Sequence, residues 1–239
     1  LGIEIFLKNK NCTIYGKGLN GFNYKKNIVL DAGNSGTFAR LILGLLVKSP
    51  YYIRLIGDKS LSKRDFNRVI LPLKKIGTNF KINSRKTLPL KIVGSDFTNP
   101  ILYYEKRGSA QCKSTVMLAG LNSPGTTIIK AKKSRDHTEN IFKYLGIPIS
   151  IKKNKLNDEI KIKGQKLFKS FKYKVPSDPS SCAFFIVLTL LSKNCELKIK
   201  NVNVNQSRIG YIDILNKMGA KIKILNKKNY KGEIIADIF

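Results

Sequence analysis

The sequence predicts an α/β fold built from a repeated unit of strand, helix, strand, helix, strand and strand. One recurring pattern is an apolar residue and a glycine before an alternating strand, at Leu1-Gly2, Ile76-Gly77, Leu145-Gly146 and Met218-Gly219. The other is a helix that opens on small polar residues and is then apolar nearly all round, in NSGTFARLILGLLV, SAQCKSTVMLAGL and DPSSCAFFIVLTLL. Both patterns return after about seventy residues, which indicates tandem repeats.

Each unit is predicted to contain two kinds of helix. In the last three copies the glycine is the C-cap of an amphipathic helix. One such helix has an apolar face made of Phe66, Val69, Ile70, Leu73 and Ile76. The other kind has no polar face, so in a soluble protein it must be buried on every side. The first unit is a remnant, and the units end near Ile28, Thr98, Tyr173 and the end of the chain.

The chain is strongly basic, with 45 Lys and Arg against 15 Asp and Glu and a formal net charge of +30. A nucleic-acid-binding protein would explain this charge. A/T-rich codons would also explain it, because Lys, Ile and Asn are all over-used. The lysines are scattered along strands and helix faces, as in KIKGQK. The sequence therefore favours a small anionic ligand over nucleic acid.

The cysteines and the apolar runs bear on the redox compartment of the protein and on whether it spans a membrane. Cys12, Cys112, Cys182 and Cys195 show no C-x-x-C spacing, and we expect reduced thiols in a cytoplasmic protein. The longest apolar runs, LILGLLV and FFIVLTLL, fall well short of the ~20 residues that span a bilayer. No membrane partner is expected.

The stretch KSRDHTEN holds the only histidine, His137. A single histidine with Asp136 and Glu139 makes a poor transition-metal site, so no metal is expected. The stretch fits a capped helix start, with Ser134 or Asp136 as the N-cap and Glu139 in the first turn. Acid/base chemistry at His137 is a further alternative.

The three apolar helices begin on small residues that would leave free backbone N–H groups at one end of the repeat. Such helix starts attract anions, and arginine binds carboxylate and phosphate with two parallel hydrogen bonds. These starts are Asn34-Ser35-Gly36-Thr37, Ser109-Ala110-Gln111 and Pro179-Ser180-Ser181. The basic residues beside them are Arg40, Arg64, Lys113, Arg135 and Arg208. Ordinary caps and surface arginines are the alternative interpretation.

Several motifs together resemble the EPSP synthase family, in the family's order and over essentially the whole chain. They are DAGNSGTFAR, GDKSLSKR, SAQCKS, SRDHTE, VPSDPSS and NVNVNQSR followed by MGA. The resemblance implies a two-domain inside-out α/β barrel, each domain with three repeated units and buried parallel helices. Residues 1–174 would form the first substrate-binding domain, with an incomplete first unit and two full units. Residues 175–239 would begin the second domain, so the barrel is incomplete.

The resemblance also implies an activity, the transfer of the enolpyruvyl group of phosphoenolpyruvate to the 5-hydroxyl of shikimate 3-phosphate. The products are EPSP and phosphate, on the pathway to chorismate. By motif, the residues that would bind shikimate 3-phosphate are Ser109, Ala110, Gln111, Ser134 and Arg135. Those that would bind phosphoenolpyruvate are Gly36, Thr37, Arg64 and Gln111. His137 would then belong to the helix start. No cofactor is implied, and a monomer is expected.

This sequence departs from the family pattern in two places and lacks two of its segments. Asp65 stands where the family usually has proline, and Ser177 where it has glycine. The family's GSKS motif would precede Leu1, and its proton-shuttling carboxylates would follow Phe239. We therefore expect an internal portion of a longer enzyme, with no catalytic residue of its own and no activity alone. Two alternatives remain, a non-catalytic anion-binding module of the same fold and a basic nucleic-acid-binding protein.

Overall fold

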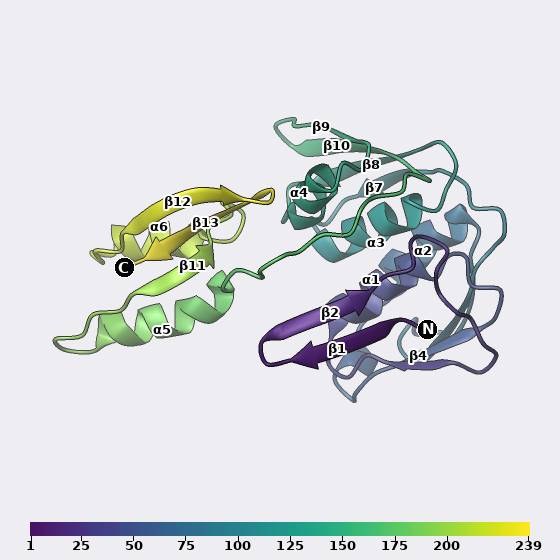
Figure 1. Cartoon of the computed structure of the whole chain (residues 1–239), viewed down its shortest axis with the longest axis horizontal. Coiled ribbons are helices and arrows are strands. Elements are labelled where there is room, and N and C mark those ends of the chain that lie inside the picture. The colour runs from purple at the N-terminus through teal and green to yellow at the C-terminus, as the bar shows by residue number, and fades with distance from the viewer. The chain divides into compact units, whose positions relative to one another are not determined.

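A computed structural model describes all 239 residues, which form two compact units. The first unit comprises Leu1–Ser134 and Gly146–Ser170, and the second comprises Arg135–Leu145 and Phe171–Phe239. Figure 1 follows the chain through its elements. The second unit thus includes α4 (His137–Tyr144), although the strands on either side of this helix in the sequence belong to the first unit.

The predicted six-element repeat is present. The remnant at the N-terminus is an exposed hairpin of β1 (Glu4–Lys8) and β2 (Asn11–Tyr15). The next repeat consists of β3 (Val29–Asp31), α1 (Gly36–Leu45), β4 (Ile53–Ile56), α2 (Asn67–Ile76), β5 (Asn79–Ile82) and β6 (Leu90–Val93), with a 3-10 turn at Leu61–Lys63. The third consists of β7 (Leu102–Glu105), α3 (Ala110–Gly120), β8 (Thr126–Lys132), α4, β9 (Ile149–Lys152) and β10 (Asn157–Lys163). The last consists of α5 (Pro179–Leu191), β11 (Ile199–Asn203), α6 (Gly210–Lys217), β12 (Ile224–Tyr230) and β13 (Glu233–Ile238).

The strand order confirms that these are copies of one unit. The two sheets of the first unit run β3-β4-β6-β5 and β7-β8-β10-β9. In each sheet the first two strands are parallel and are joined through a helix, and the other pairs are antiparallel. The sheet of the second unit runs β11-β13-β12, and a parallel bridge from Ser177 to Val202 takes the place of the missing first strand.

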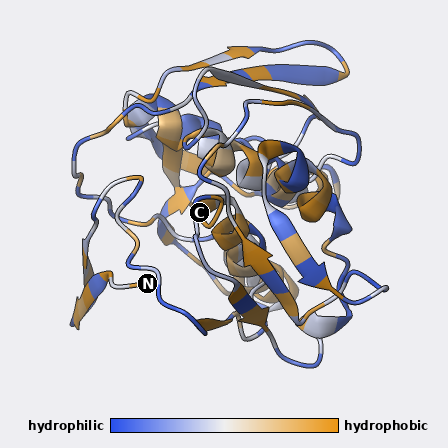
Figure 2. Ribbon diagram, turned by 90° about the vertical axis from the view of Figure 1, so that its right-hand side faces the viewer, coloured by the Kyte–Doolittle hydropathy of each residue, from blue (hydrophilic) through white to orange (hydrophobic).

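The amphipathic helix α2 follows the predicted pattern. All five residues of its predicted apolar face are buried. Gly77 ends the helix as its C-cap with a φ of 126°, a conformation that favours glycine. Figure 2 shows hydrophobic and hydrophilic residues alternating along strands of the sheets, as expected when one face of a sheet is buried.

The apolar helices are not all buried to the same extent. In α3 nearly every residue from Cys112 to Gly120 is buried, as predicted. In α5 the expectation of burial on every side is wrong, because Pro179, Cys182 and Ile186 are its only buried residues. Phe184 is 79% exposed and Leu191 is 81% exposed.

Helices α1 and α3 lie against each other within the first unit, between its two sheets (Figure 1). The residue numbers of contacting pairs increase together along the two helices. Gln111 contacts Thr37, and further along Thr115 contacts Arg40 and Gly44. The two helices therefore run parallel. A Cβ at Gly44 would overlap the carbonyl oxygen of Thr115, so only glycine permits this approach.

We expect Gly44→Ala to destabilise the first unit by about 1–3 kcal/mol, the usual cost of adding a methyl group to a filled core. Gly16→Ala is the matched control, because a Cβ there meets nothing within 4 Å. The free energy of unfolding in urea measures both. Equal stability of the two variants would contradict the close contact of α1 and α3.

We expect replacement of Phe184 and Leu188 by Gln to raise the solubility of the chain. Both side chains are largely exposed, so their loss removes apolar surface without opening a cavity. The measurements are the protein concentration at which light scattering rises and the free energy of unfolding. The reverse outcome, a strongly destabilised variant of unchanged solubility, would show that these side chains are covered.

Candidate functional site

The starts of α1 and α3 meet in the first unit. Ser35 is the N-cap of α1 and Ser109 is the N-cap of α3, and each accepts a hydrogen bond from the backbone three residues on. Gln111 joins the two helices, since its Nε2 donates to Thr37 Oγ1 at 2.7 Å and its Oε1 accepts from Arg40 Nη1 at 2.9 Å. The structure thus brings together Thr37 and Gln111, which the sequence placed in one anion site.

Two guanidinium groups converge on Gly36, the first residue of α1. A Cβ at Gly36 would lie 2.8 Å from Arg40 Nη1 and 3.1 Å from Arg64 Nη1. Burial lowers the pKa of Arg40, and the nearby charge of Arg64 lowers it further. Two like charges beside the positive end of a helix create a site that favours an anion.

Arg40 was expected among the basic residues beside the helix starts but was not assigned to either substrate. Its signal was its position four residues after Gly36, which places both residues on the same face of α1. Arg40 also donates to the carbonyl oxygen of Gly36 at 3.2 Å. The Arg40 side chain is therefore held over the start of α1, because its Nη1 donates both to Gln111 and to the backbone of its own helix.

Asp65, which departs from the family pattern, has a local structural role. Its Oδ1 accepts a hydrogen bond from the backbone N–H of Asn67 at 2.7 Å, where α2 begins. Its carbonyl oxygen accepts from Arg40 Nη2 at 3.4 Å. The acidic group beside Arg64 thus accepts a hydrogen bond from the first N–H group of α2.

The predicted residues Ser109, Ala110 and Ser134 lie near the carboxyl ends of the parallel strands β7 and β8. Ser109 and Ala110 begin α3, and Ser134 follows β8. A Cβ at Gly108 would lie 3.2 Å from the carbonyl oxygen of Lys133, so the two loops adjoin. Hydroxyl groups from both loops therefore come from one edge of the sheet.

A buried carboxylate organises the loop before α3. Glu105 is 3% exposed and accepts from Arg68 Nη2 at 2.6 Å and from the backbone N–H of Ser109 at 2.8 Å. Burial alone would lower the pKa of Arg68, but the hydrogen bond to Glu105 leaves it raised. Glu105 thus fixes the loop that leads to Ser109, a role that no sequence signal indicated.

Arg135, the remaining predicted residue, lies in the second unit two residues before the start of α4. The helix begins at His137 with Asp136 as its N-cap residue and Glu139 in the first turn, as one of the sequence alternatives had it. The Asp136 carboxylate caps no backbone N–H group. It accepts instead from Asn205 Nδ2 at 2.7 Å.

His137, whose side chain is partly exposed, takes part in a network of hydrogen bonds around the buried Glu233. Its Nδ1 lies 2.7 Å from Glu233 Oε1, and Asn203 Nδ2 donates to the other oxygen of Glu233 at 2.9 Å. Burial by itself would raise the pKa of Glu233, but the hydrogen bonds from His137 and Asn203 lower it to about 2. This carboxylate is therefore ionised across the neutral range.

Arg208, one of the basic residues that the sequence associated with an anion, is already paired. Its Nη2 donates to Asp178 Oδ1 at 2.5 Å and to Ser180 Oγ at 2.8 Å, at the start of α5. The charge of Arg208 is thus balanced within the second unit. Lys113 is buried in α3.

The family model of EPSP synthase (3-phosphoshikimate 1-carboxyvinyltransferase) matches residues 1–235. The chain belongs to the EPSP synthase family. It is 45% identical to the 3-phosphoshikimate 1-carboxyvinyltransferase of Ruthia magnifica over 239 residues, which cover 100% of this chain and 54% of that protein. It is 39% identical to the enzyme of that name from Syntrophomonas wolfei, with 55% of that protein covered.

The structural comparison agrees with the sequence comparison. An EPSP synthase structure from Acinetobacter baumannii superposes with a TM-score of 0.86 at 34% identity, over 99% of this chain and 53% of that one. The α/β repeat predicted from the sequence is thus the EPSP synthase fold. The chain spans about half the length of the relatives that it matches.

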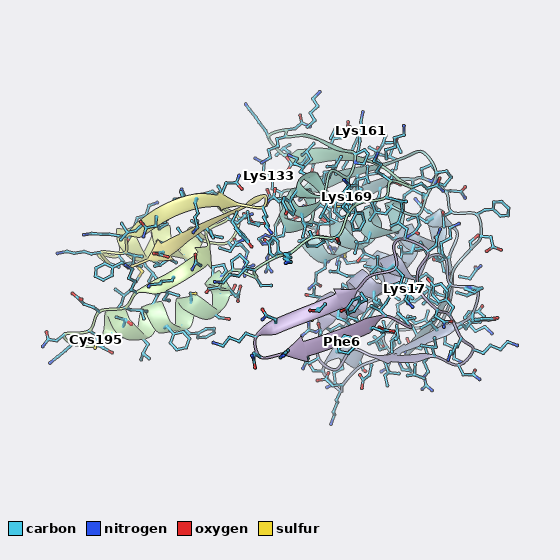
Figure 3. The ribbon with its side chains drawn as sticks, viewed as in Figure 1. Phe6, Lys17, Lys133, Lys161, Lys169 and Cys195 are labelled. Atoms are coloured by element: carbon cyan, nitrogen blue, oxygen red, sulfur yellow. The ribbon has the colours of Figure 1, made fainter.

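Two further findings bear on the class of protein. None of the helices has the length and apolar character that a membrane span requires. The four cysteines are unpaired. The basic side chains of this EPSP synthase family member are spread over several elements. Figure 3 labels three exposed examples, Lys17 after β2, Lys161 on β10 and Lys169 after β10.

Glu233 makes the stability of the second unit depend on pH. A pKa lowered to about 2 in the folded state, from an ordinary value of 4.5, stabilises the fold above pH 4.5. That contribution is lost as the pH falls from 4.5 towards 2. We therefore expect wild-type and Glu233→Gln proteins to differ most in urea stability at neutral pH and to converge at low pH. A difference that grows with acidity would contradict the network.

Proposed function

We propose that the protein to which this chain belongs transfers the enolpyruvyl group of phosphoenolpyruvate to the 5-hydroxyl of shikimate 3-phosphate, with release of phosphate. The observation that carries the proposal is the convergence of Arg40 and Arg64 on Gly36, beside Gln111. Both substrates are polyanions with carboxylate and phosphate groups. A helix start with two guanidinium groups fits such groups.

In this proposal the first unit binds phosphoenolpyruvate at the start of α1. Gly36 has no Cβ, so an anion can approach the backbone N–H groups closely. Thr37 offers a hydroxyl group, Gln111 an amide, and Arg64 a planar pair of donors. The arginines would also stabilise the phosphate that leaves when the bond between C2 and the phosphate oxygen breaks, because its charge increases at that step.

Shikimate 3-phosphate would bind beside it, at the start of α3. Ala110 and Gln111 supply the first N–H groups of the helix, and Ser109 and Gln111 supply polar side chains. Ser134 and Arg135 supply a hydroxyl group and a cation from the segment that follows β8. The common position of Gln111 would hold the two substrates together, so that the 5-hydroxyl is close to C2 of phosphoenolpyruvate.

The remaining expectations fit this function and are proposed with it. Residues 1–174 would belong to the first domain and 175–239 would begin the second. The four unpaired cysteines support a cytoplasmic location. We propose a monomer that needs no cofactor.

Titration calorimetry of the chain with each substrate tests the proposal. We expect Arg64→Ala to weaken binding of phosphoenolpyruvate, and Arg135→Ala that of shikimate 3-phosphate, by about 1.5–3 kcal/mol, the scale of a charge-assisted hydrogen bond. Arg54→Ala is the control, because Arg54 is exposed on β4. Unchanged affinity in Arg64→Ala and Arg135→Ala would contradict the assignment.

The alternatives give different results in the same assays. A nucleic-acid-binding protein would bind duplex DNA with an affinity that falls steeply with salt. A non-catalytic module would bind both substrates and release no phosphate when joined to the rest of its protein.

A further inference from the structure

The carboxylate of Glu233 bonds to two side chains at the start of α4 and to two asparagines in and after β11. Besides His137 and Asn203, it accepts from Asn140 Nδ2 at 3.3 Å, one turn further along the helix. Only 6% of Glu233 is exposed. A buried charge must collect donors from its surroundings, and here two of them come from the first turns of α4.

The backbone beside Glu233 also contacts this helix. Gly232 has a φ of 89°, and a Cβ there would lie 2.7 Å from the carbonyl oxygen of Asn140. The turn between β12 and β13 is thus pressed against α4 where only glycine fits. The position of the helix relative to β13 is fixed by both backbone contact and hydrogen bonds.

A second connection reaches the residue next to Arg135. Asn205, which follows β11, donates through Nδ2 to Asp136 Oδ1 at 2.7 Å and lies 3.5 Å from Glu233 Oε2. Asp136 and His137, the two residues after Arg135, are therefore both held by groups on the sheet of the second unit.

A further charged group lies on the other side of the His137 ring. Arg208 Nη1 is 3.5 Å from His137 Nε2. Arg208 is held in turn by Asp178. The charged groups around His137 are thus Glu233, Arg208 and Asp136, with Asp178 behind the arginine.

We propose that Glu233 is a positioning residue for shikimate 3-phosphate, acting through the first turn of α4 on Arg135. This inference rests on the proposed function. Arg135 is exposed and has a long, flexible side chain. Its backbone is fixed by its neighbours, so less freedom is lost when it binds a phosphate group.

The proposal requires an effect that is selective for one substrate. Gly36, Arg40 and Arg64 belong to the first unit, and none of their hydrogen bonds involves Glu233. Loss of Glu233 should therefore weaken shikimate 3-phosphate binding and leave phosphoenolpyruvate binding nearly unchanged. A general loss of folding would weaken both.

The test is calorimetric titration of the 239-residue chain with each substrate separately. We expect Glu233→Gln to weaken shikimate 3-phosphate about tenfold and phosphoenolpyruvate less than about twofold. Glu233→Asp, which keeps the charge on a shorter side chain, should recover part of the loss. Glu159→Gln is the control, since Glu159 makes surface ion pairs on β10, and should change neither affinity.

A double-variant cycle tests whether the effect passes through Arg135. In the Arg135→Ala background, Glu233→Gln should cause little further loss of shikimate 3-phosphate affinity. Additive losses, or equal losses for both substrates, would overturn the proposal. If Glu233→Gln does not fold, His137→Ala replaces it, because it removes the 2.7 Å contact at a partly exposed site. Unchanged shikimate 3-phosphate affinity in His137→Ala would then overturn the proposal.

The outcomes separate this inference from the proposed function. A wild-type chain that does not bind shikimate 3-phosphate overturns both. A wild-type chain that binds it, with Glu233→Gln binding equally well, overturns the positioning role alone.

Discussion

The close contact of the parallel helices α1 and α3 is the constraint on which the first unit depends. Gly44 allows the helices to approach, and Thr115 bonds across to the carbonyl oxygen of Arg40 at 3.0 Å. Because the helices run in the same direction, their positive ends lie side by side. The approach of Arg40 and Arg64 adds two more charges. The result is a concentration of positive charge, whose electrostatic cost a bound anion would relieve.

Two buried carboxylates offset the positive charge where the chain must be held in place. Glu105 ends β7 and fixes the loop before α3, whereas Glu233 begins β13 and holds the start of α4. In a chain with 15 acidic and 45 basic residues, each carboxylate has many potential partners on the surface. Burying these two makes their interactions specific, since a buried charge requires its own set of donors.

Helix α4 shows that sequence repeat and structural unit need not coincide. In the sequence it links β8 to β9, in the position that α2 and α6 occupy in their repeats. Its polar side chains nevertheless bond to Asn205 and Glu233. Helix α5 differs in the opposite way. It occupies the position that the repeat predicts, but much of its apolar surface is exposed to solvent. Local sequence therefore sets the type of helix, and the neighbouring elements decide what covers it.

The sequence by itself determined the repeat, the kind of each helix and most of the helix starts. These features follow from local geometry, since helical and strand periodicities and N-caps depend on residues a few positions apart. The buried face of α2 and the cap at Ser109 were accessible in this way, whereas the shared site of Thr37 and Gln111, 74 residues apart, was implied only by the resemblance to the family. The tertiary structure alone decided that Arg208 pairs with Asp178, that Arg68 pairs with Glu105 and that His137 faces Glu233. These partners are separated by 30, 37 and 96 residues, and no local pattern specifies which distant charge will meet which. Only the arrangement of the strands and helices brings them within hydrogen-bonding distance.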